Sequence, residues 1–317
     1  MINKTTKHLS TFIFIISILL VSTSIYAKKP TDISNHWAQD YILNLVNNEV
    51  MDNYKDGEFR PDQAITRGEF AVALAKQLNL VPDNNSHFKD INGYPNYPMI
   101  NSLVNKDIVS GYPDNTFRPD KALTRAEMIA IMIKSLGITD NQVTIELDNY
   151  STFKDIPENH WGLNHIKIAD KLDLINGDQN NHFNPNKTAS RAEAAKVITK
   201  LASLTSETGY ITDVYPSSNK VSINSLNGER TVYNFGDETL VGRNNRFVKL
   251  DDIMKTDKVF IIADSSNNNI RYAKAYGMVT EDDLATEVST MTNGVFQPEE
   301  IKKLSYGNIN ILRPKVQ

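Results

Sequence analysis

Residues 54–70 read YKDGEFRPDQAITRGEF, and this pattern returns twice further along the chain. The second copy is YPDNTFRPDKALTRAEM at 112–128, and the third is DQNNHFNPNKTASRAEA at 178–194. Three copies of one pattern indicate a repeat architecture, in which each copy is a unit that must pack against its neighbours. The copies share one arginine, 58 and then 66 residues apart, which is Arg67, Arg125 and Arg191 in chain order.

The similarity between the copies extends well before these segments. Trp37 and Trp161 both lie 30 residues before the arginine of their copy. In the second copy Pro95 holds this position, between Tyr94 and Tyr97. Agreement at that distance is hard to obtain by chance. We therefore expect three domains of one kind, at 31–80, 88–138 and 153–204, with a linker at 139–152.

Each unit predicts a short helix, a turn-rich loop and a second helix. In the first unit Ala38, Ile42, Leu45 and Val46 recur at helical spacing and form one apolar stripe. The loop 53–62 is rich in Asp, Asn, Gly and Pro, which supply turn geometry. A single stripe of this size cannot form a core, so the three units are expected to pack against one another.

The start of each second helix fits a capping box, in which a hydroxyl and a carboxylate satisfy each other's free backbone N–H groups. The tetrads are Thr66-Arg67-Gly68-Glu69, Thr124-Arg125-Ala126-Glu127 and Ser190-Arg191-Ala192-Glu193. A capping box does not explain the arginine, because a cation in the first turn opposes the helix macrodipole and costs about 0.3–1 kcal/mol. Its repetition predicts an anion site made of the guanidinium and the free N–H groups of the helix N-terminus. The alternative is an internal salt bridge to the aspartate at the head of a repeat, which is Asp32, Asp90 or Asp155.

The tripled pattern resembles the S-layer homology domain family over residues 31–204. The resemblance rests on the aspartate and tryptophan near the start of a unit and on the TRAE sequence at its second helix. It implies a three-pronged bundle of helices whose grooves bind secondary cell-wall polysaccharide of Gram-positive bacteria, typically through a pyruvylated sugar. The polysaccharide-binding residues that it implies are Arg67, Arg125, Arg191, Trp37, Trp161, Thr66, Thr124, Ser190, Asp32, Asp90 and Asp155.

The three binding sites are expected to be unequal. Trp37 and Trp161 could pack in the core or offer a flat face to a sugar ring, and the family resemblance raises the second interpretation to equal weight. The second copy lacks this tryptophan, and the third has Asn184 and Asn186 where the first has the Arg and Asp of RPD. We therefore expect the middle repeat to be the weakest.

From Gly209 the apolar residues follow a period of two, which is typical of strands. Asn227-Gly228 between two such runs predicts a hairpin with a type I′ turn. Together the runs predict about five strands and a small closed or half-closed barrel over 209–279. The expected fold class is multidomain α + β, a three-repeat helical bundle followed by a small β-barrel-like module. The tail at 280–317 predicts two short helices and a strand.

Residues 1–27 have the features of a secretory signal peptide. Lys4 and Lys7 precede an apolar run at 12–21, and small or polar residues follow up to Ala27, after which we expect cleavage. The run has ten residues, whereas a bilayer span takes about 20, so no permanent membrane span is expected. These features and the resemblance predict a secreted protein at the cell wall or S-layer.

The composition argues against several classes of function. The formal net charge of −4 gives no reason to expect a nucleic-acid partner. The absence of cysteine excludes disulfides and thiolate chemistry, and neither the loop carboxylates nor the histidines have the spacing of a calcium or zinc site. Residues 205–317 also lack histidine, so no nucleophilic triad is expected there. We expect no metal, no cofactor and no enzymatic activity.

The predicted function is non-covalent anchoring of an exported protein to the cell wall, with the β module on display. A self-assembling S-layer lattice or S-layer-associated subunit is the alternative, although about 110 residues after the repeats are few for assembly regions. A wall-anchored hydrolase has less support. No motif identifies a protein partner for the β module.

Overall fold

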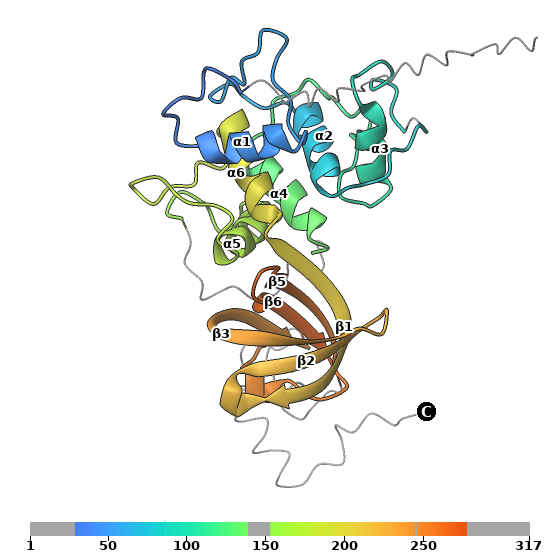
Figure 1. Cartoon of the computed structure of the whole chain (residues 1–317), viewed down its shortest axis with the longest axis vertical. Coiled ribbons are helices and arrows are strands. Elements are labelled where there is room, and N and C mark those ends of the chain that lie inside the picture. Colours follow the sequence, from blue (N-terminus) through green and yellow to red (C-terminus); the bar gives the residue numbers. More distant parts are fainter. Residues whose placement is uncertain (1–28, 86, 139–152, 245, 278–317) are drawn as a thin grey trace, which may run out of the picture.

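The computed structural model describes residues 29–277, except 86, 139–152 and 245. Within these residues a group of six helices is followed by a curled sheet of six strands, as Figure 1 shows. The predicted signal peptide, the linker at 139–152 and the tail at 280–317 lie outside the described residues.

Each repeat contributes two helices, in the order that its sequence predicts. The first helices are α1 (Gln39–Asn47), α3 (Tyr97–Val104) and α5 (Leu163–Lys171). The second helices are α2 (Arg67–Gln77), α4 (Arg125–Ser135) and α6 (Arg191–Leu201). All three second helices begin with the complete capping box, which fixes the arginine of each repeat as the first helical residue.

The helices pack in pairs across repeats. The packed pairs are α3 on α2, α5 on α4 and α1 on α6. Each pair joins the first helix of one repeat to the second helix of the repeat before it, and the pair α1 and α6 joins the first repeat to the last. The bundle therefore has three two-helix prongs and closes on itself.

A ring of backbone hydrogen bonds lies where the three repeats meet. The N–H group of Ile65 donates to the carbonyl of Ala189 at 2.9 Å, that of Ala189 to Leu123 at 2.9 Å, and that of Leu123 back to Ile65 at 3.1 Å. All three residues are fully buried, so water does not compete for these bonds. Because each repeat donates to one neighbour and accepts from the other, the ring needs all three repeats.

The sheet forms the second domain. Its strands are β1 (Leu204–Tyr215), β2 (Lys220–Ser225), β3 (Arg230–Arg243), β4 (Arg246–Phe247), β5 (Lys258–Asp264) and β6 (Asn269–Tyr276). The strand order is β2-β1-β5-β6-β3-β4, and β3 also pairs with β2, so the sheet curls back on itself. The expected small β domain is confirmed. It is not a regular barrel, because register shifts interrupt three of the pairings and β4 adds a short edge.

The hairpin between β2 and β3 forms where the sequence predicts it, but the turn type was predicted wrongly. A type I′ turn requires positive φ at both central residues. Gly228 has a φ of 91°, whereas Asn227 is not among the residues with positive φ. The N–H group of Ser225 donates to Glu229, so three residues form the loop and glycine supplies its left-handed position.

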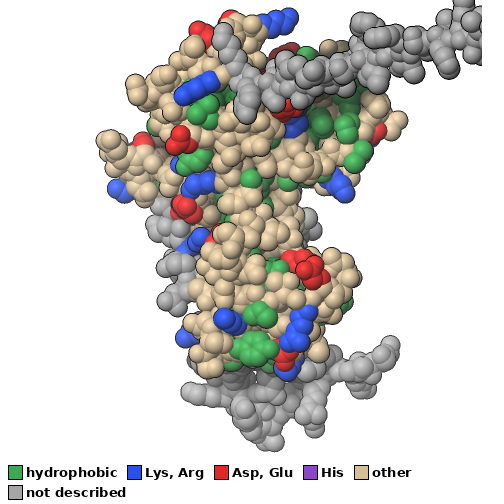
Figure 2. Space-filling view, viewed as in Figure 1, with side chains coloured by type: hydrophobic (Ala, Val, Ile, Leu, Met, Phe, Trp, Pro, Cys, Tyr) green, Lys and Arg blue, Asp and Glu red, His purple; other side chains and the backbone are tan. Residues whose placement is uncertain are grey.

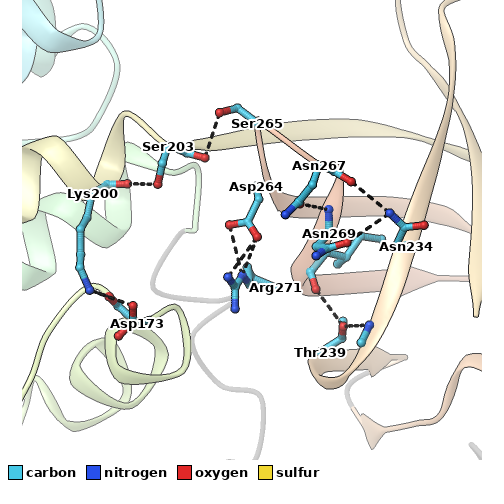
Figure 3. A network of polar contacts seen from close by, with 12 residues as sticks. Asp173, Lys200, Ser203, Asn234, Thr239, Asp264, Ser265, Asn267, Asn269 and Arg271 are labelled. Carbon is cyan, nitrogen blue, oxygen red and sulfur yellow. Dashed lines mark hydrogen bonds and ion pairs between the residues drawn. The ribbon is translucent and has the colours of Figure 1, made fainter.

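The two domains share one core. Helix α6 and strand β1 are separated by two residues, and Ile262 and Tyr272 on the outer face of the sheet are buried in the same cluster as the helices. Figure 3 shows the polar contacts at this junction, where the hydroxyl of Ser265 donates to the carbonyl of Ser203 at 3.0 Å. The sheet is therefore held directly on the helical bundle.

The surface carries no large region of one charge on the face that Figure 2 shows, where acidic and basic side chains are interspersed over both domains. Among the helices of the described residues, none combines the length and the apolar character needed to cross a membrane.

Candidate functional site

Each arginine of the tetrads reaches from its own helix into the loop of the next repeat. Its Nε donates to the carbonyl oxygen of a buried phenylalanine, and the guanidinium lies over the ring of the same residue. The pairs are Arg67 with Phe117, Arg125 with Phe183 and Arg191 with Phe59, with N–O distances of 3.1, 2.7 and 2.8 Å. The arginines therefore lock the three repeats into one circle.

Two of the arginines also pair with a carboxylate of the capping boxes. Arg191 binds Glu69 at 3.1 Å, and Arg125 binds Glu193. Both guanidinium groups are largely buried, with side-chain exposures of 5% and 13%. Each ion pair thus joins two repeats and neutralises the arginine inside the bundle.

Arg67 differs from the other two. The equivalent carboxylate, Glu127, binds the ammonium of Lys121 at 2.6 Å instead. Arg67 donates to the carbonyl of Ser110 at 2.6 Å, and within the described residues no carboxylate forms an ion pair with it. Burial lowers the pKa of the Arg67 guanidinium. Its positive charge is therefore available to an anion.

The N–H groups at the starts of the second helices are not free, so this part of the predicted anion site is wrong. In α2 the N–H of Arg67 donates to Lys121 and that of Gly68 donates to Pro119, both at 2.8 Å. The next N–H, of Glu69, donates to the Thr66 hydroxyl at 3.2 Å. In α4 and α6 carbonyls of the neighbouring loop and the hydroxyls of Thr124 and Ser190 fill the same roles.

The aspartates at the heads of the repeats hold the loops of their own repeat. Each carboxylate accepts two successive backbone N–H groups, those of Phe59 and Arg60 for Asp32, Phe117 and Arg118 for Asp90, and Phe183 and Asn184 for Asp155. The second residue of each pair has a φ of 57° or 58°, a conformation that residues other than glycine seldom adopt. The alternative salt bridge to the tetrad arginines is therefore wrong, because these carboxylates are already used.

Both tryptophans lie on the surface, so the interpretation as core residues is wrong. Trp37 is 57% exposed and Trp161 is 59% exposed. Each ring packs against the preceding histidine, with centroids 5.4 Å apart at His36 and 5.7 Å apart at His160. The Nδ1 atoms of these histidines accept the N–H group two residues later, which fixes the imidazole beneath the tryptophan.

Trp37 lies at a cavity between two prongs. The cavity has a volume of about 180 Å³ and is lined by Arg125 of α4, by Glu193 and Lys196 of α6, and by Phe183. Two cations therefore face one carboxylate beside an exposed indole ring. Burial lowers the pKa of Lys196, whose ammonium donates to the Asn176 amide oxygen.

The corresponding cavity at Arg191 has a different lining. It measures about 700 Å³, and Tyr94 and Pro95 stand where the other repeats have tryptophan. Its remaining charged residues are Lys55, Asp52, Glu69, Asp90 and Asp120. Carboxylates therefore outnumber cations here.

The sequence-predicted residues come together in combinations that cross the repeats. Trp37 of the first repeat lies with Arg125 of the second, and Tyr94 of the second lies with Arg191 of the third. The same relation assigns Trp161 of the third repeat to Arg67 of the first. Helix α5, which follows Trp161, packs on α4, and the space beside Gly162 is bounded by Ala126.

Lys196 was missed by sequence reasoning. The equivalent residues, five positions after the tetrad arginine, are Val72 and Ala130. A lysine at a position that is apolar in the other repeats was the available signal.

Comparison with known proteins agrees with this architecture. The profile of the S-layer homology domain matches residues 31–71, 87–129 and 152–195. The chain is 35% identical over 139 residues to the cellulosome-anchoring protein of Acetivibrio thermocellus, covering 42% of this chain and 30% of that protein. It is 29% identical over 280 residues to S-layer protein EA1 of Bacillus anthracis, covering 86% of this chain and 30% of that protein.

Enzymes also share this region. An amylopullulanase of Thermoanaerobacterium thermosulfurigenes is 32% identical over 177 residues, which are 55% of this chain and 9% of the enzyme. The chain thus spans between a tenth and a third of the length of these three relatives. Three matches in order, on the three repeats whose arginines close one circle, identify this chain as a cell-surface protein that carries three tandem S-layer homology domains.

Proposed function

We propose that this chain anchors an exported protein to the bacterial cell wall by binding the pyruvylated sugar of a secondary cell-wall polysaccharide. The observation that carries this proposal is the exposed Trp37 beside the cations Arg125 and Lys196. A flat indole face packs against the CH groups of a sugar ring, and the cations bind the carboxylate of a pyruvate ketal. The β domain is displayed on the anchor and has no catalytic role.

The three grooves are proposed to differ in affinity for such an anion. The Trp37 groove combines an indole with an excess of positive charge, and Arg67, assigned to Trp161, has no carboxylate partner among the described residues. The Arg191 groove has Tyr94 in place of tryptophan and an excess of carboxylates, which repel an anionic ligand. The loss of tryptophan from the middle repeat therefore weakens the Arg191 groove.

The test is retention of the purified full chain on cell-wall fragments, before and after chemical removal of pyruvate from the polysaccharide. Trp37→Ala and Trp161→Ala are expected to reduce retention while leaving the melting temperature unchanged, because both rings are exposed. Tyr94→Ala should have the smaller effect on retention. Full retention by the Trp37→Ala/Trp161→Ala variant, or on walls without pyruvate, would overturn the proposal.

Lys196→Val provides a matched variant, because valine is the natural residue at the equivalent position of the first repeat. It removes the second cation of the Trp37 groove and keeps an apolar stem on α6. We expect weaker retention at low salt, and a smaller difference at high salt, where charge interactions are screened.

A second candidate function is that of an S-layer lattice subunit or S-layer-associated protein. The similarity to S-layer protein EA1 favours it, because this match covers 86% of the chain and so extends beyond the repeats. Negative-stain imaging of the purified chain separates the two functions. Ordered arrays would favour a lattice subunit, whereas dispersed particles that bind walls favour a displayed module. Turnover of a wall polymer by the purified chain would contradict a non-enzymatic role.

A further inference from the structure

A straight row of exposed side chains crosses the outer face of the β domain. Cross-strand partners run in the order Arg230, Asn224, Tyr210, Lys258 and Tyr276, from β3 through β2, β1 and β5 to β6. Directly opposed residues of antiparallel strands point to the same side of a sheet, so the five side chains share one face. All five are exposed, and the two tyrosines are 48% and 40% exposed.

The row begins where the cover of the helical bundle ends. On β5, Ile262 is buried in the shared core and Phe260 is partly buried against it, whereas Lys258, two residues further from the bundle, is exposed. On β6, Tyr272 is buried in the same core and Tyr276 is exposed. One sheet face thus serves first as the domain junction and then as an open surface.

The two tyrosines have a spacing that suits an extended polymer. Tyr210 and Tyr276 lie two strands apart, which is about 10 Å in a sheet. Lys258 stands between them on the intervening strand. The ammonium of Lys274 lies 5.4 Å from the centre of the Tyr276 ring and supports it from the same strand. The result is a flat surface with a cation between two rings.

The charge of this surface is positive, although the chain as a whole is acidic. The row contains two cations and no carboxylate. The neighbouring Asp213 is already bound by Arg230 at 2.8 Å and by Lys255. Lys258 has no ion-pair partner among the described residues. An anion is therefore attracted to the centre of the row.

We propose that this row binds an extended strand of a carboxylated polysaccharide, with sugar rings on Tyr210 and Tyr276 and a carboxylate on Lys258. A sugar ring offers the CH-rich face that packs on an aromatic ring, and a carboxylate forms a charge-assisted hydrogen bond with an ammonium. Single-stranded nucleic acid is the competing partner, but it carries one phosphate per nucleotide and depends on several cations along its path. The row offers Lys258 alone, because Arg230 is paired with Asp213.

The test is a titration of the full chain with polygalacturonate, with neutral dextran and poly(dT) as comparisons. Binding to polygalacturonate should fall at least about tenfold in Tyr210→Ala/Tyr276→Ala and persist in Tyr210→Phe/Tyr276→Phe, because stacking needs the ring and not the hydroxyl. Lys258→Gln should weaken binding and reduce its salt dependence. Tyr215→Ala is the matched control, since Tyr215 is 39% exposed on the same domain and lies outside the row.

The outcomes separate this proposal from wall anchoring by the repeats. Loss of polygalacturonate binding in Trp37→Ala/Trp161→Ala, with no change in Tyr210→Ala/Tyr276→Ala, would assign binding to the grooves and overturn the proposal. Tighter binding of poly(dT) than of polygalacturonate would overturn it in favour of nucleic acid. Equal binding of dextran would remove the role of Lys258.

Discussion

The Nε atom of Arg191 donates to the carbonyl oxygen of Phe59 at 2.8 Å, although 132 residues separate the two in sequence. The same guanidinium binds Glu69 of the first repeat at 3.1 Å and the carbonyl of Asp52 at 2.9 Å. The last repeat is thus fastened to the first through one buried side chain, and the circle of repeats is closed at this point.

Arg191→Ala is expected to lower the free energy of unfolding by about 3–5 kcal/mol, because it leaves the partly buried Glu69 carboxylate without its partner. Arg67→Ala should cost less, since Arg67 has no carboxylate to abandon among the described residues. Urea denaturation measures both values. Equal losses in the two variants would contradict the asymmetry between the arginines.

Gly68 is predicted to be required by Tyr94. A Cβ atom at position 68 would lie 2.4 Å from the Tyr94 hydroxyl oxygen, whereas Ala126 and Ala192 occupy the equivalent positions without difficulty. Gly68→Ala should therefore destabilise the chain by about 1–3 kcal/mol. In a Tyr94→Ala background the same change should stabilise it by about 0.5–1 kcal/mol, because alanine is the better helix former. A double-mutant cycle that shows no coupling would refute the contact.

Tyr272 has a buried hydroxyl with no hydrogen-bond partner at the domain junction. Tyr272→Phe removes this unsatisfied group and should raise the free energy of unfolding by about 1 kcal/mol. Burial also raises the pKa of Tyr272. Above about pH 10 the unfolded chain loses this proton while the folded chain keeps it, so stability falls as pH rises. Thermal melts from pH 8 to 11 should show a smaller decline for Tyr272→Phe than for the parent chain.

Asp114 in the loop of the second repeat is expected to remain ionised in strong acid. A hydrogen bond from the Thr116 hydroxyl, followed by one from Arg118, lowers its pKa to about 2. The contribution of this carboxylate is present above about pH 4 and is lost as pH falls towards 2. Carboxyl chemical shifts measure the titration directly. Thr116→Val should move the midpoint upwards, and an unchanged midpoint would show that the hydroxyl has no part in it.

The local features of the fold could be predicted from sequence because neighbouring residues determine them. The tetrad of Thr66 to Glu69 specifies a helix start through contacts three residues apart, and the structure starts the helix there. The strands of the β domain likewise follow from the alternation of apolar residues. Asn227-Gly228 marked a hairpin, although its turn type depended on a pairing that composition does not determine.

The combination of residues in each groove could not be predicted, because it depends on contacts between repeats. Sequence alignment places Trp161 beside Arg191, since both belong to the third repeat. In the folded ring each repeat lends its first helix to the prong of the preceding repeat, and the tryptophan moves with it. The role of Asp32 was hidden for a similar reason, because its partners are backbone groups about 27 residues away.

The closed circle has a consequence for how such a protein can evolve. The groove at Trp37 takes its indole from the first repeat, its guanidinium from the second and its lysine from the third. A gene that loses one repeat therefore forfeits every groove together, whereas a single substitution in one repeat alters only one part of one groove. Selection can adjust the three grooves separately by point mutation, but it must inherit the repeats as a set of three.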